Sequence, residues 1–254
     1  MTPLLELNHV TYAYHSKSGE TYALSDISFQ VQEGEFIAVI GPSGCGKSTL
    51  LSLIAGLLTP EEGRILLNGS SPKTQKEKIG YMLQKDLLFE WRTVYRNVIL
   101  GLEIQRRLTK ETKENIEKML KDYGLWRFRD ARPSELSGGM RQRAALIRTL
   151  ALNPRLLLLD EPFSALDFQT RLSVCDDVTG ILRSQKKTAV LVTHDLSEAV
   201  SMADRVIVLS KRPAKIRKVL PLHFEQPDLT PFQRRSAPEF NDYFNLLWKE
   251  LNDA

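Results

Sequence analysis

The amino-acid sequence predicts an α/β fold around a mainly parallel sheet, and three observations carry this prediction. Uninterrupted apolar runs such as 156–159 are typical of parallel strands that are buried on both faces. A glycine-rich loop at 41–46 separates one such run from a helix that begins at Lys47. Polar residues follow several of these runs, where the carboxyl ends of parallel strands meet ligands.

Composition limits the class of protein. The chain has 254 residues, enough for one large domain or two small ones. Its net charge of +4 comes from 35 basic and 31 acidic residues, so it gives no evidence for nucleic-acid binding. Two cysteines, Cys45 and Cys175, cannot form a disulfide framework, and we expect reduced thiols. We also expect no signal peptide and no membrane span.

The first part of the chain, residues 4 to 32, is expected to form antiparallel strands. Apolar and polar side chains alternate at 27–32, as in a sheet buried on one face. Tyr12 and Tyr14 lie on the first of these strands. From this segment alone, cross-strand packing is favoured over the stacking of an adenine ring on either tyrosine.

Residues 41–48 match G-x-x-x-x-G-K-[ST], the phosphate loop of nucleoside-triphosphate-binding proteins. Its glycines can adopt backbone angles closed to other residues, so that successive N–H groups turn toward phosphate oxygens. The following helix directs its positive end at the same charge. Lys47 is expected to reach the outer phosphates, and the Ser48 hydroxyl to bind Mg²⁺. The residues assigned to this nucleotide site are Gly41, Pro42, Ser43, Gly44, Cys45, Gly46, Lys47, Ser48 and Thr49. Cys45, beside Lys47, is expected to have enhanced thiolate character.

The middle of the chain alternates between strands and helices. An Asn68-Gly69 turn closes one strand, and an apolar strand at 79–84 ends at Gln84, where a ligand could be contacted. Residues 86 to 152 are predicted to be helical, with an apolar stripe around Leu120 between Thr109 and Gly124. A second Ser/Gly-rich turn at 134–139 leads into a helix and is a second candidate anion site.

Charged residues end two later strands. The apolar run 156–159 leads directly into Asp160 and Glu161, which packing alone explains poorly. One carboxylate could hold Mg²⁺ while the other orients or deprotonates an attacking water. His194 follows the strand at 188–193, where a catalytic and a structural role both remain open. Residues 205–209 supply the last predicted strand.

The C-terminal part is expected to wrap around the domain. Prolines recur beyond Ser210, which predicts an extended segment. The chain then ends in an amphipathic helix that packs on the domain or contacts another subunit. We expect an ATP-binding domain over 4–232, with a helical subdomain at about 86–152, and the C-terminal helix over 233–254. The apolar face of that helix is formed by Phe240, Tyr243, Phe244, Leu247, Trp248 and Leu251.

Six segments resemble the ATP-binding subunits of ABC transporters. They are the phosphate loop 41–48, Gln84, the run 136–142 (Leu-Ser-Gly-Gly-Met-Arg-Gln), the strand 156–161, the run 164–167 (Ser-Ala-Leu-Asp) and His194. The segments follow the family's order and cover nearly the whole chain. The Leu-Ser-Gly-Gly run is the most specific, because other phosphate-loop NTPases lack it. The implied fold is a phosphate-loop NTPase core with a mainly parallel central sheet, an N-terminal antiparallel β-subdomain and an inserted α-helical subdomain.

The resemblance implies a role for each matching residue. Tyr14 matches the aromatic residue that stacks on adenine, against the packing role favoured above. Gln84 would bind Mg²⁺ and sense the γ-phosphate. Asp160 would lie on the metal side, Glu161 would be the catalytic carboxylate, and His194 would act as the γ-phosphate switch. ATP and Mg²⁺ are thus the expected cofactors.

The resemblance also implies partners. Two ATP-binding subunits of this family meet head to tail, so the turn Ser137, Gly138 and Gly139 of one copy would close over ATP held by the other. Asp167 would bridge the two copies, and hydrolysis would require the dimer. An integral membrane permease would bind the dimer at the cytoplasmic face of the cell membrane, and a solute-binding protein would act indirectly. No nucleic-acid partner is expected.

Within the family, residues 84–97 and 210–216 are similar to importers of the nitrate, sulfonate, taurine and pyrimidine-precursor group. That group usually has Leu-Leu-Pro-Trp-Arg-Thr-Val, whereas this chain has Phe89-Glu90 before Trp91. The resemblance implies an ATPase that energises import of a small anion or related solute, with residues 86–97 receiving a permease helix. The substrate itself would be selected by the permease and binding protein.

An alternative is a soluble ABC ATPase that acts on nucleic acid or ribosomes without a permease. Such proteins usually carry two motor domains or a long coiled-coil insertion, for which 86–152 is too short.

Overall fold

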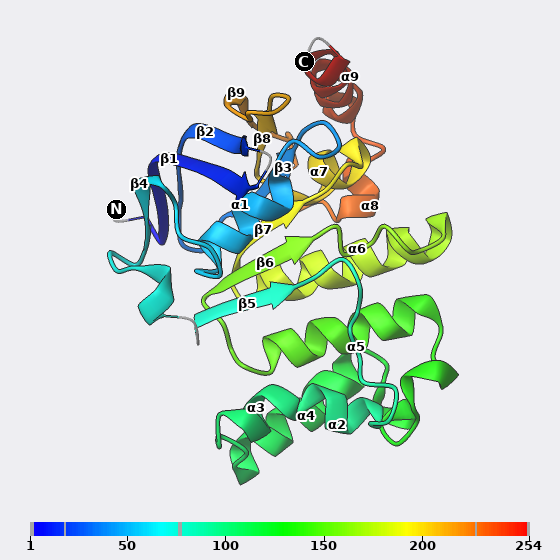
Figure 1. Ribbon diagram of the computed structural model, residues 1–254. Helices are drawn as coiled ribbons and strands as arrows, with labels where there is room; N and C mark the ends of the chain where they lie inside the picture. The colour runs from blue at the N-terminus through cyan, green and yellow to red at the C-terminus, as the bar shows by residue number, and fades with distance from the viewer. Residues whose placement is uncertain (1–2, 18, 76–77, 227, 253–254) are drawn as a thin grey trace.

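The computed structural model describes residues 3–17, 19–75, 78–226 and 228–252. Its central sheet has six strands in the order β5-β6-β7-β3-β8-β9 (Figure 1). The first five strands are parallel, and β9 pairs with β8 in the antiparallel sense. The predicted mainly parallel sheet is therefore confirmed. The strands are β3 (Phe36–Ile40), β5 (Ile79–Met82), β6 (Leu156–Asp160), β7 (Thr188–Val192), β8 (Arg205–Leu209) and β9 (Ile216–Pro221).

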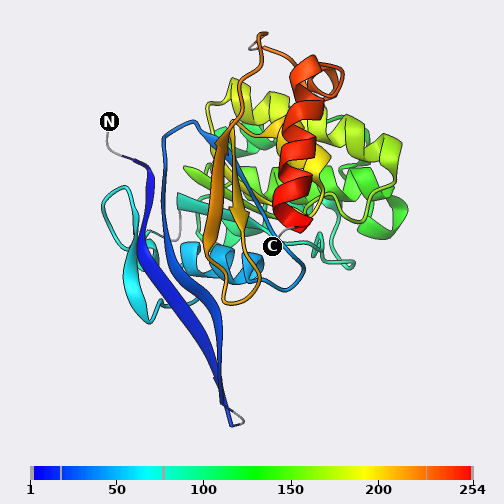
Figure 2. The same cartoon turned by 90° about the horizontal axis from the view of Figure 1, so that it is seen from above.

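A second sheet is antiparallel and has the order β2-β1-β4. Strands β1 (Leu5–Ser16) and β2 (Gly19–Val31) form a hairpin that projects from the rest of the molecule (Figure 2). Strand β4 (Glu62–Leu67) ends at the predicted Asn68-Gly69 turn, where φ is 50° and 74°. The predicted antiparallel strands are confirmed.

The central sheet separates two layers of helices. In β3, Ile37 and Val39 pack with α1 (Lys47–Ile54) and the antiparallel sheet. Phe36 packs on the other side, in a cluster with α5 (Gly138–Leu150) and α6 (Phe168–Ser184). Successive side chains of β6 and β7 likewise alternate between the cluster that contains α1 and the cluster that contains α5 and α6. Because successive strand residues point to opposite faces, α1 lies on one face of the sheet and α5 and α6 lie on the other.

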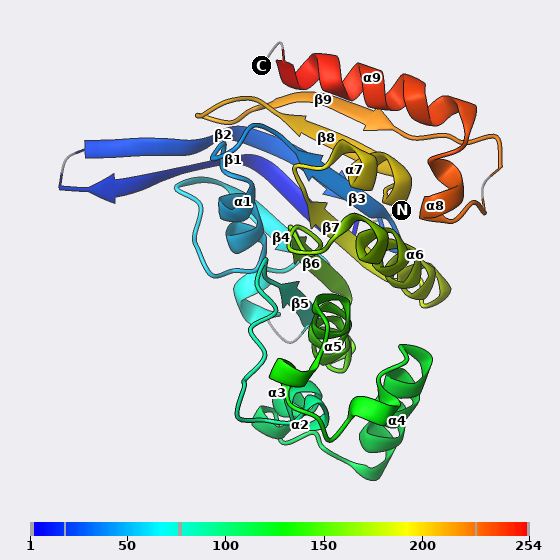
Figure 3. The ribbon, with the colours of Figure 1, turned by 90° about the vertical axis from the view of Figure 1, so that its right-hand side faces the viewer.

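Short helices extend the layer of α5 away from the sheet (Figure 3). They are α2 (Val94–Val98), α3 (Leu100–Ile104), α4 (Lys110–Asp122), η3 (Trp126–Phe128) and η4 (Pro133–Glu135), while η1 (Pro72–Thr74) follows β4. The predicted stripe on α4 is buried at Ile116 and Leu120. Thr109 caps α4, and Gly124 follows it with φ 71°. The spacing and the cap residues therefore predicted this helix correctly.

The C-terminal part contains a strand that the proline pattern did not predict, since β9 pairs with β8. Helix α8 (Pro231–Arg234) spans the expected boundary between residues 232 and 233. Helix α7 (Leu196–Met202) packs against α9 (Pro238–Asn252), which lies beside β8 and β9 (Figure 3). Leu247 is buried there, but Trp248 is 57% exposed. In the described part of the chain, no helix combines the length and apolar character needed to span a membrane.

We expect Gly63→Ala to destabilise the fold much more than Gly69→Ala. Both glycines have positive φ, so a side chain costs about 1–2 kcal/mol at either position. At Gly63 an added Cβ would also lie 2.2 Å from the Asn8 carbonyl oxygen on β1, whereas nothing lies within 4 Å at Gly69. Thermal unfolding of the two variants measures the difference, and equal losses in Tm would contradict the prediction.

Candidate functional site

The carboxyl ends of β3, β6 and β7 lie at one edge of the central sheet. Val192 of β7 pairs with Val39 of β3 on one side and with Asp160 of β6 on the other. The chain continues from these strands into the loop 41–46, Glu161 and His194. The structure therefore brings together three of the segments that the sequence assigned to nucleotide chemistry.

The loop 41–46 curves around the Lys47 ammonium group. Lys47 Nζ donates hydrogen bonds to the carbonyl oxygens of Gly41 at 2.8 Å and Pro42 at 3.1 Å. Gly44 and Gly46 have φ of 72° and 123°, backbone angles that residues with a side chain rarely adopt. Gly46 is also the N-cap of α1. Lys47, although charged, is buried at the base of the loop.

The Cys45 thiol faces the protein interior and is only 2% exposed. Burial raises its pKa above the ordinary value, and the nearby charge of Lys47 opposes this only in part. The predicted enhancement of thiolate character is therefore wrong, because desolvation of the sulfur outweighs the neighbouring cation. The sequence showed that Lys47 lies near Cys45, but it did not show that the Cys45 thiol is buried.

Arg212 contacts the same loop from a distant part of the chain. Its Nε donates to the Gly44 carbonyl oxygen at 2.7 Å, across 168 positions of sequence. Sequence analysis recognised the segment 210–216 only as a subgroup pattern and did not connect it with the loop. Arg212 within that pattern was the residue that could have indicated a contact with the loop.

Tyr14 of β1 lies beside the start of α1. The hydroxyl groups of Tyr14 and Thr49 form a hydrogen bond of 3.0 Å. The Tyr14 ring packs edge-on against Tyr12, with 5.1 Å between ring centroids, and is 45% exposed. Tyr14 thus contacts a neighbour on its own strand and a residue of α1, rather than a ring on another strand, and it leaves an exposed aromatic surface next to the loop.

Asp160 is a buried carboxylate that faces the start of α1. Ser48 Oγ donates to its Oδ1 at 3.1 Å, and the Tyr81 hydroxyl lies 3.5 Å from Oδ2. Burial raises the pKa of Asp160, with the hydrogen bond from Ser48 opposing the shift. Sequence analysis missed Tyr81, which lies within the apolar strand before Gln84.

These donors fit Mg²⁺, which prefers oxygen ligands and commonly uses one or two carboxylates together with substrate phosphates. Ser48 and Asp160 supply a hydroxyl and a carboxylate within hydrogen-bonding distance of each other. No group of three or more His, Cys, Asp or Glu that could hold a metal occurs among the described residues. A Mg²⁺ ion held by Ser48 and Asp160 would take further oxygen ligands from substrate phosphates.

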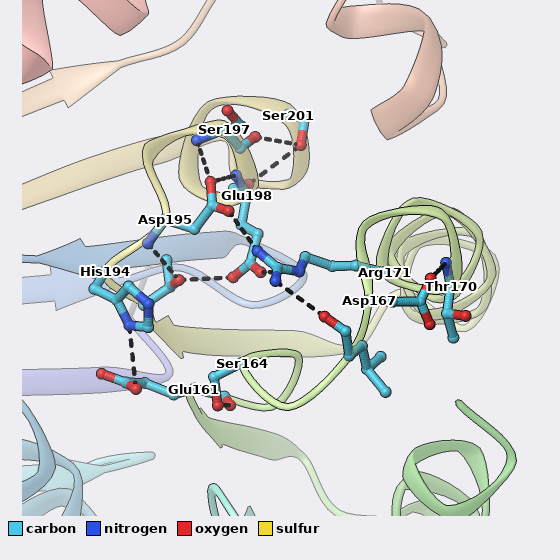
Figure 4. A network of polar contacts seen from close by, with 12 residues as sticks. Glu161, Ser164, Asp167, Thr170, Arg171, His194, Asp195, Ser197, Glu198 and Ser201 are labelled. Carbon is cyan, nitrogen blue, oxygen red and sulfur yellow. Dashed lines mark hydrogen bonds and ion pairs between the residues drawn. The ribbon is translucent and has the colours of Figure 1, made fainter. Parts of the chain in front are cut away.

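Glu161 lies between Gln84 and His194. Gln84 Nε2 donates to Glu161 Oε2 at 3.1 Å. His194 Nδ1 lies 3.2 Å from the same oxygen, a contact that Figure 4 shows. Glu161 has φ 46°, a left-handed conformation that costs a non-glycine residue about 1–2 kcal/mol. Hydrogen bonds to Val192 and Ser164 hold its backbone in place. The Glu161 side chain therefore contacts Gln84 and His194, whereas the Asp160 side chain contacts Ser48 and Tyr81.

The remaining predicted residues begin two helices on the other face of the sheet. Ser137 caps α5 by accepting from the Met140 N–H at 3.4 Å, and Asp167 caps α6 by accepting from the Thr170 N–H at 3.0 Å. Hydrogen bonds from Thr170 hold the Asp167 pKa below its usual value. Ser137, Gly138 and Asp167 are exposed, whereas Gly139 is buried. Within one chain the sheet separates these residues from α1.

Two arginines of α5 hold the loop that follows Gln84. Arg141 makes a two-pronged contact with the Asp86 carboxylate, at 2.8 and 3.2 Å, and a further contact with Glu90. Arg148 donates to the carbonyl oxygens of Asp86 and Leu87 at 2.6 and 2.7 Å. A cavity of about 670 Å³ lies between this loop, α5 and residues 164–165.

The same loop presents two stacked aromatic rings. The centroids of Phe89 and Trp91 are 4.7 Å apart, and Trp91 is 73% exposed. The buried side chain of Asn97 bonds both the N–H and the carbonyl oxygen of Phe89, at 2.7 and 3.1 Å. Arg141, Arg148 and Asn97 therefore hold an exposed apolar surface rigidly. The sequence indicated its residues but not these contacts.

Comparison with known proteins identifies the family. Residues 24–164 match the family model described as ABC transporter. An uncharacterized ABC transporter ATP-binding protein of Bacillus subtilis, YtlC, is 50% identical over 248 residues, which are 98% of this chain and 95% of that protein. The aliphatic sulfonates import ATP-binding protein SsuB of Bacillus licheniformis is 41% identical, with coverage of 94% and 91%. The nitrate import ATP-binding protein NrtD of Synechocystis is 40% identical, with the same coverage.

A solved structure agrees with these relatives. The ATP-binding cassette MJ0796, described as a dimer in a post-hydrolysis state bound to ADP and Pi, superposes with a TM-score of 0.76. It is 32% identical, and the match covers 86% of this chain and 99% of that one. The predicted resemblance and fold class are confirmed. This chain belongs to the ABC transporter family, as an ATP-binding subunit that hydrolyses ATP.

Proposed function

We propose that this chain powers the import of a small solute, as the ATPase of a binding-protein-dependent transporter. The sulfonate and nitrate import proteins among its relatives support a small organic or inorganic anion, or a related solute, as cargo. The chain would bind an integral membrane permease at the cytoplasmic face of the cell membrane. The ATPase activity is supported above all by the position of Glu161, which lies between Gln84 and His194 beside the phosphate loop.

In the proposed reaction, Glu161 orients a water molecule and accepts its proton as the water oxygen attacks the γ-phosphorus. The bond from that phosphorus to the β–γ bridging oxygen breaks, which releases ADP and phosphate. Gln84 and His194 hold the Glu161 carboxylate in place through Oε2. Lys47 would exchange its contacts with Gly41 and Pro42 for the outer phosphates.

Ser48, Asp160 and Gln84 would hold Mg²⁺ together with the phosphates. When bound, the ion supplies positive charge that offsets the charge developing on the phosphate oxygens. Tyr14 would stack on the adenine ring through its exposed face. The loop N–H groups and the N-terminus of α1 would bind the phosphates.

The separation of Ser137–Gly139 from the phosphate loop supports a head-to-tail dimer. A helix N-terminus favours phosphate, yet α5 and α1 of one chain lie on opposite faces of the sheet. A second copy would present its Ser137, Gly138 and Gly139 to the ATP held by the first, with Asp167 between the copies. The dimeric MJ0796 cassette is consistent with such an assembly.

We expect Glu161→Gln to bind ATP but to lower turnover by about 100-fold or more, because the amide cannot accept the proton. The ATP-bound dimer should accumulate. Phosphate release measures turnover, and size-exclusion chromatography with ATP measures the dimer. Glu62→Gln, an exposed change on β4, serves as the control. Normal turnover by the Glu161 variant would exclude this residue as the base.

Mixing two inactive variants tests the dimer. Lys47→Ala removes a phosphate contact in one copy, and Ser137→Arg blocks the turn that the other copy supplies. In a head-to-tail dimer of one of each, one site carries both defects and the other carries none. An equimolar mixture should therefore recover about a quarter of wild-type turnover, since about half of the dimers are mixed. If each site lay within one chain, the mixture would stay inactive.

Trp91→Ala should weaken capture of the co-expressed permease by about 30-fold or more, because an exposed aromatic ring on a rigid surface is a typical binding hot spot. Trp248→Ala, which removes an equally large exposed ring from α9, should leave capture unchanged. Pull-down from detergent-solubilised membranes measures capture, with Tm as the check on folding. Purification of the wild-type chain with nucleic acid and without a membrane protein would favour the soluble alternative.

A further inference from the structure

Arg171 of α6 joins two loops that carry proposed site residues (Figure 4). Its Nη2 donates to the Leu166 carbonyl oxygen at 3.0 Å, and its Nη1 donates to Asp195 Oδ2 at 2.9 Å. Leu166 directly precedes Asp167, and Asp195 directly follows His194. One guanidinium group therefore connects the loop expected to face a second copy with the loop that carries the histidine next to Glu161.

The contact with Asp195 reaches the backbone on both sides of His194. Asp195 Oδ1 accepts from the N–H groups of Ser197 and Glu198, at 2.7 and 3.2 Å, and so begins α7. The Asp195 N–H donates to Thr193 Oγ1 at 3.0 Å. The two oxygens of the Asp195 carboxylate thus have different partners: Oδ1 accepts from the backbone of α7, and Oδ2 accepts from Arg171. A movement of Arg171 would be transmitted through Asp195 to the position of His194.

The buried Glu198 supplies a further link. Thr193 Oγ1 donates to Glu198 Oε2 at 2.6 Å, and Arg171 Nε lies 3.9 Å from Glu198 Oε1. That Nε atom is buried and has no hydrogen-bond partner. The guanidinium charge therefore acts on Glu198 through electrostatic attraction and not through a hydrogen bond. Burial raises the Glu198 pKa to about 7, and the charge of Arg171 opposes the shift. Arg171 therefore faces two carboxylates at once, Asp195 directly after His194 and Glu198 on α7.

We propose that Arg171 is a positioning residue for ATP hydrolysis, which sets the location of His194 according to the location of the Asp167 loop. This inference rests on the proposed roles of His194 and of the second copy. When the second copy contacts Asp167, the displacement of the Leu166 carbonyl passes through the guanidinium to Asp195 and His194. Hydrolysis in one copy would thereby respond to the arrival of the other. Among the residues that the structure describes, Arg171 forms no hydrogen bond or ion pair with Glu161 or with the phosphate loop.

Arg171→Lys separates geometry from charge. Lysine keeps the positive charge but lacks the planar fork that reaches a carbonyl and a carboxylate together. We expect ATP affinity and Tm close to wild type, and a kcat that falls about tenfold or more, as for a group misplaced by a distant change. Arg183→Lys is the matched control, because Arg183 lies on the same helix and also contacts one carbonyl, of Met202, and one carboxylate, of Asp204. The control should retain wild-type kcat.

A double variant tests whether Arg171 acts through His194. If it does, Arg171→Lys should lower kcat little further in a His194→Ala background, whereas independent effects would multiply. Multiplied losses, or an unchanged kcat in a folded Arg171→Lys variant, would overturn the inference and leave the proposed function intact. Arg171→Gln, which keeps hydrogen bonding but not charge, repeats the cycle if the lysine variant unfolds. Unchanged kcat in His194→Ala alone would instead refute the proposed role of His194, and the inference with it.

Discussion

In the central sheet, Phe36 of β3 pairs with Ala189 of β7, and Leu156 of β6 pairs with Thr188 of the same strand. This parallel register makes the three strands end together, so the loops that follow them lie side by side. Ser48 consequently reaches Asp160 across 112 positions of sequence. A slip of one residue in β6 would exchange its two faces and displace both carboxylates. The chemistry of the edge therefore depends on the register of apolar strand residues that take no part in it.

The same alternation of side chains divides the molecule into two halves. Strand residues that face α1 support the phosphate loop, and their neighbours on the opposite face support α5 and α6. The Ser137–Gly139 turn and Asp167 thus lie at helix starts that the sheet separates from the nucleotide site of their own chain. In the head-to-tail dimer proposed above, a second copy would bring these two helix starts to the nucleotide site.

Arginine side chains connect segments that the sheet leaves apart. Arg141 and Arg148 attach the 86–90 loop to α5, Arg212 supports the phosphate loop, and Arg171 joins the loops at 166 and 195. Arginine suits this task because its planar fork can bind two acceptors in a fixed relation. These contacts give the loops defined positions relative to the helices and strands around them.

The sequence by itself determined the strands other than β9, the capped helix α4, the glycine-rich loop and the family, since each depends on a local period, a turn residue or an ordered set of motifs. It also predicted that Gln84, Glu161 and His194 would meet at one sheet edge, because parallel strands end together. Only the tertiary structure decided that Arg212 supports Gly44, that β9 extends the sheet, that the Cys45 thiol is desolvated and that Trp248 stays exposed. These features depend on contacts between distant segments, which no local pattern encodes.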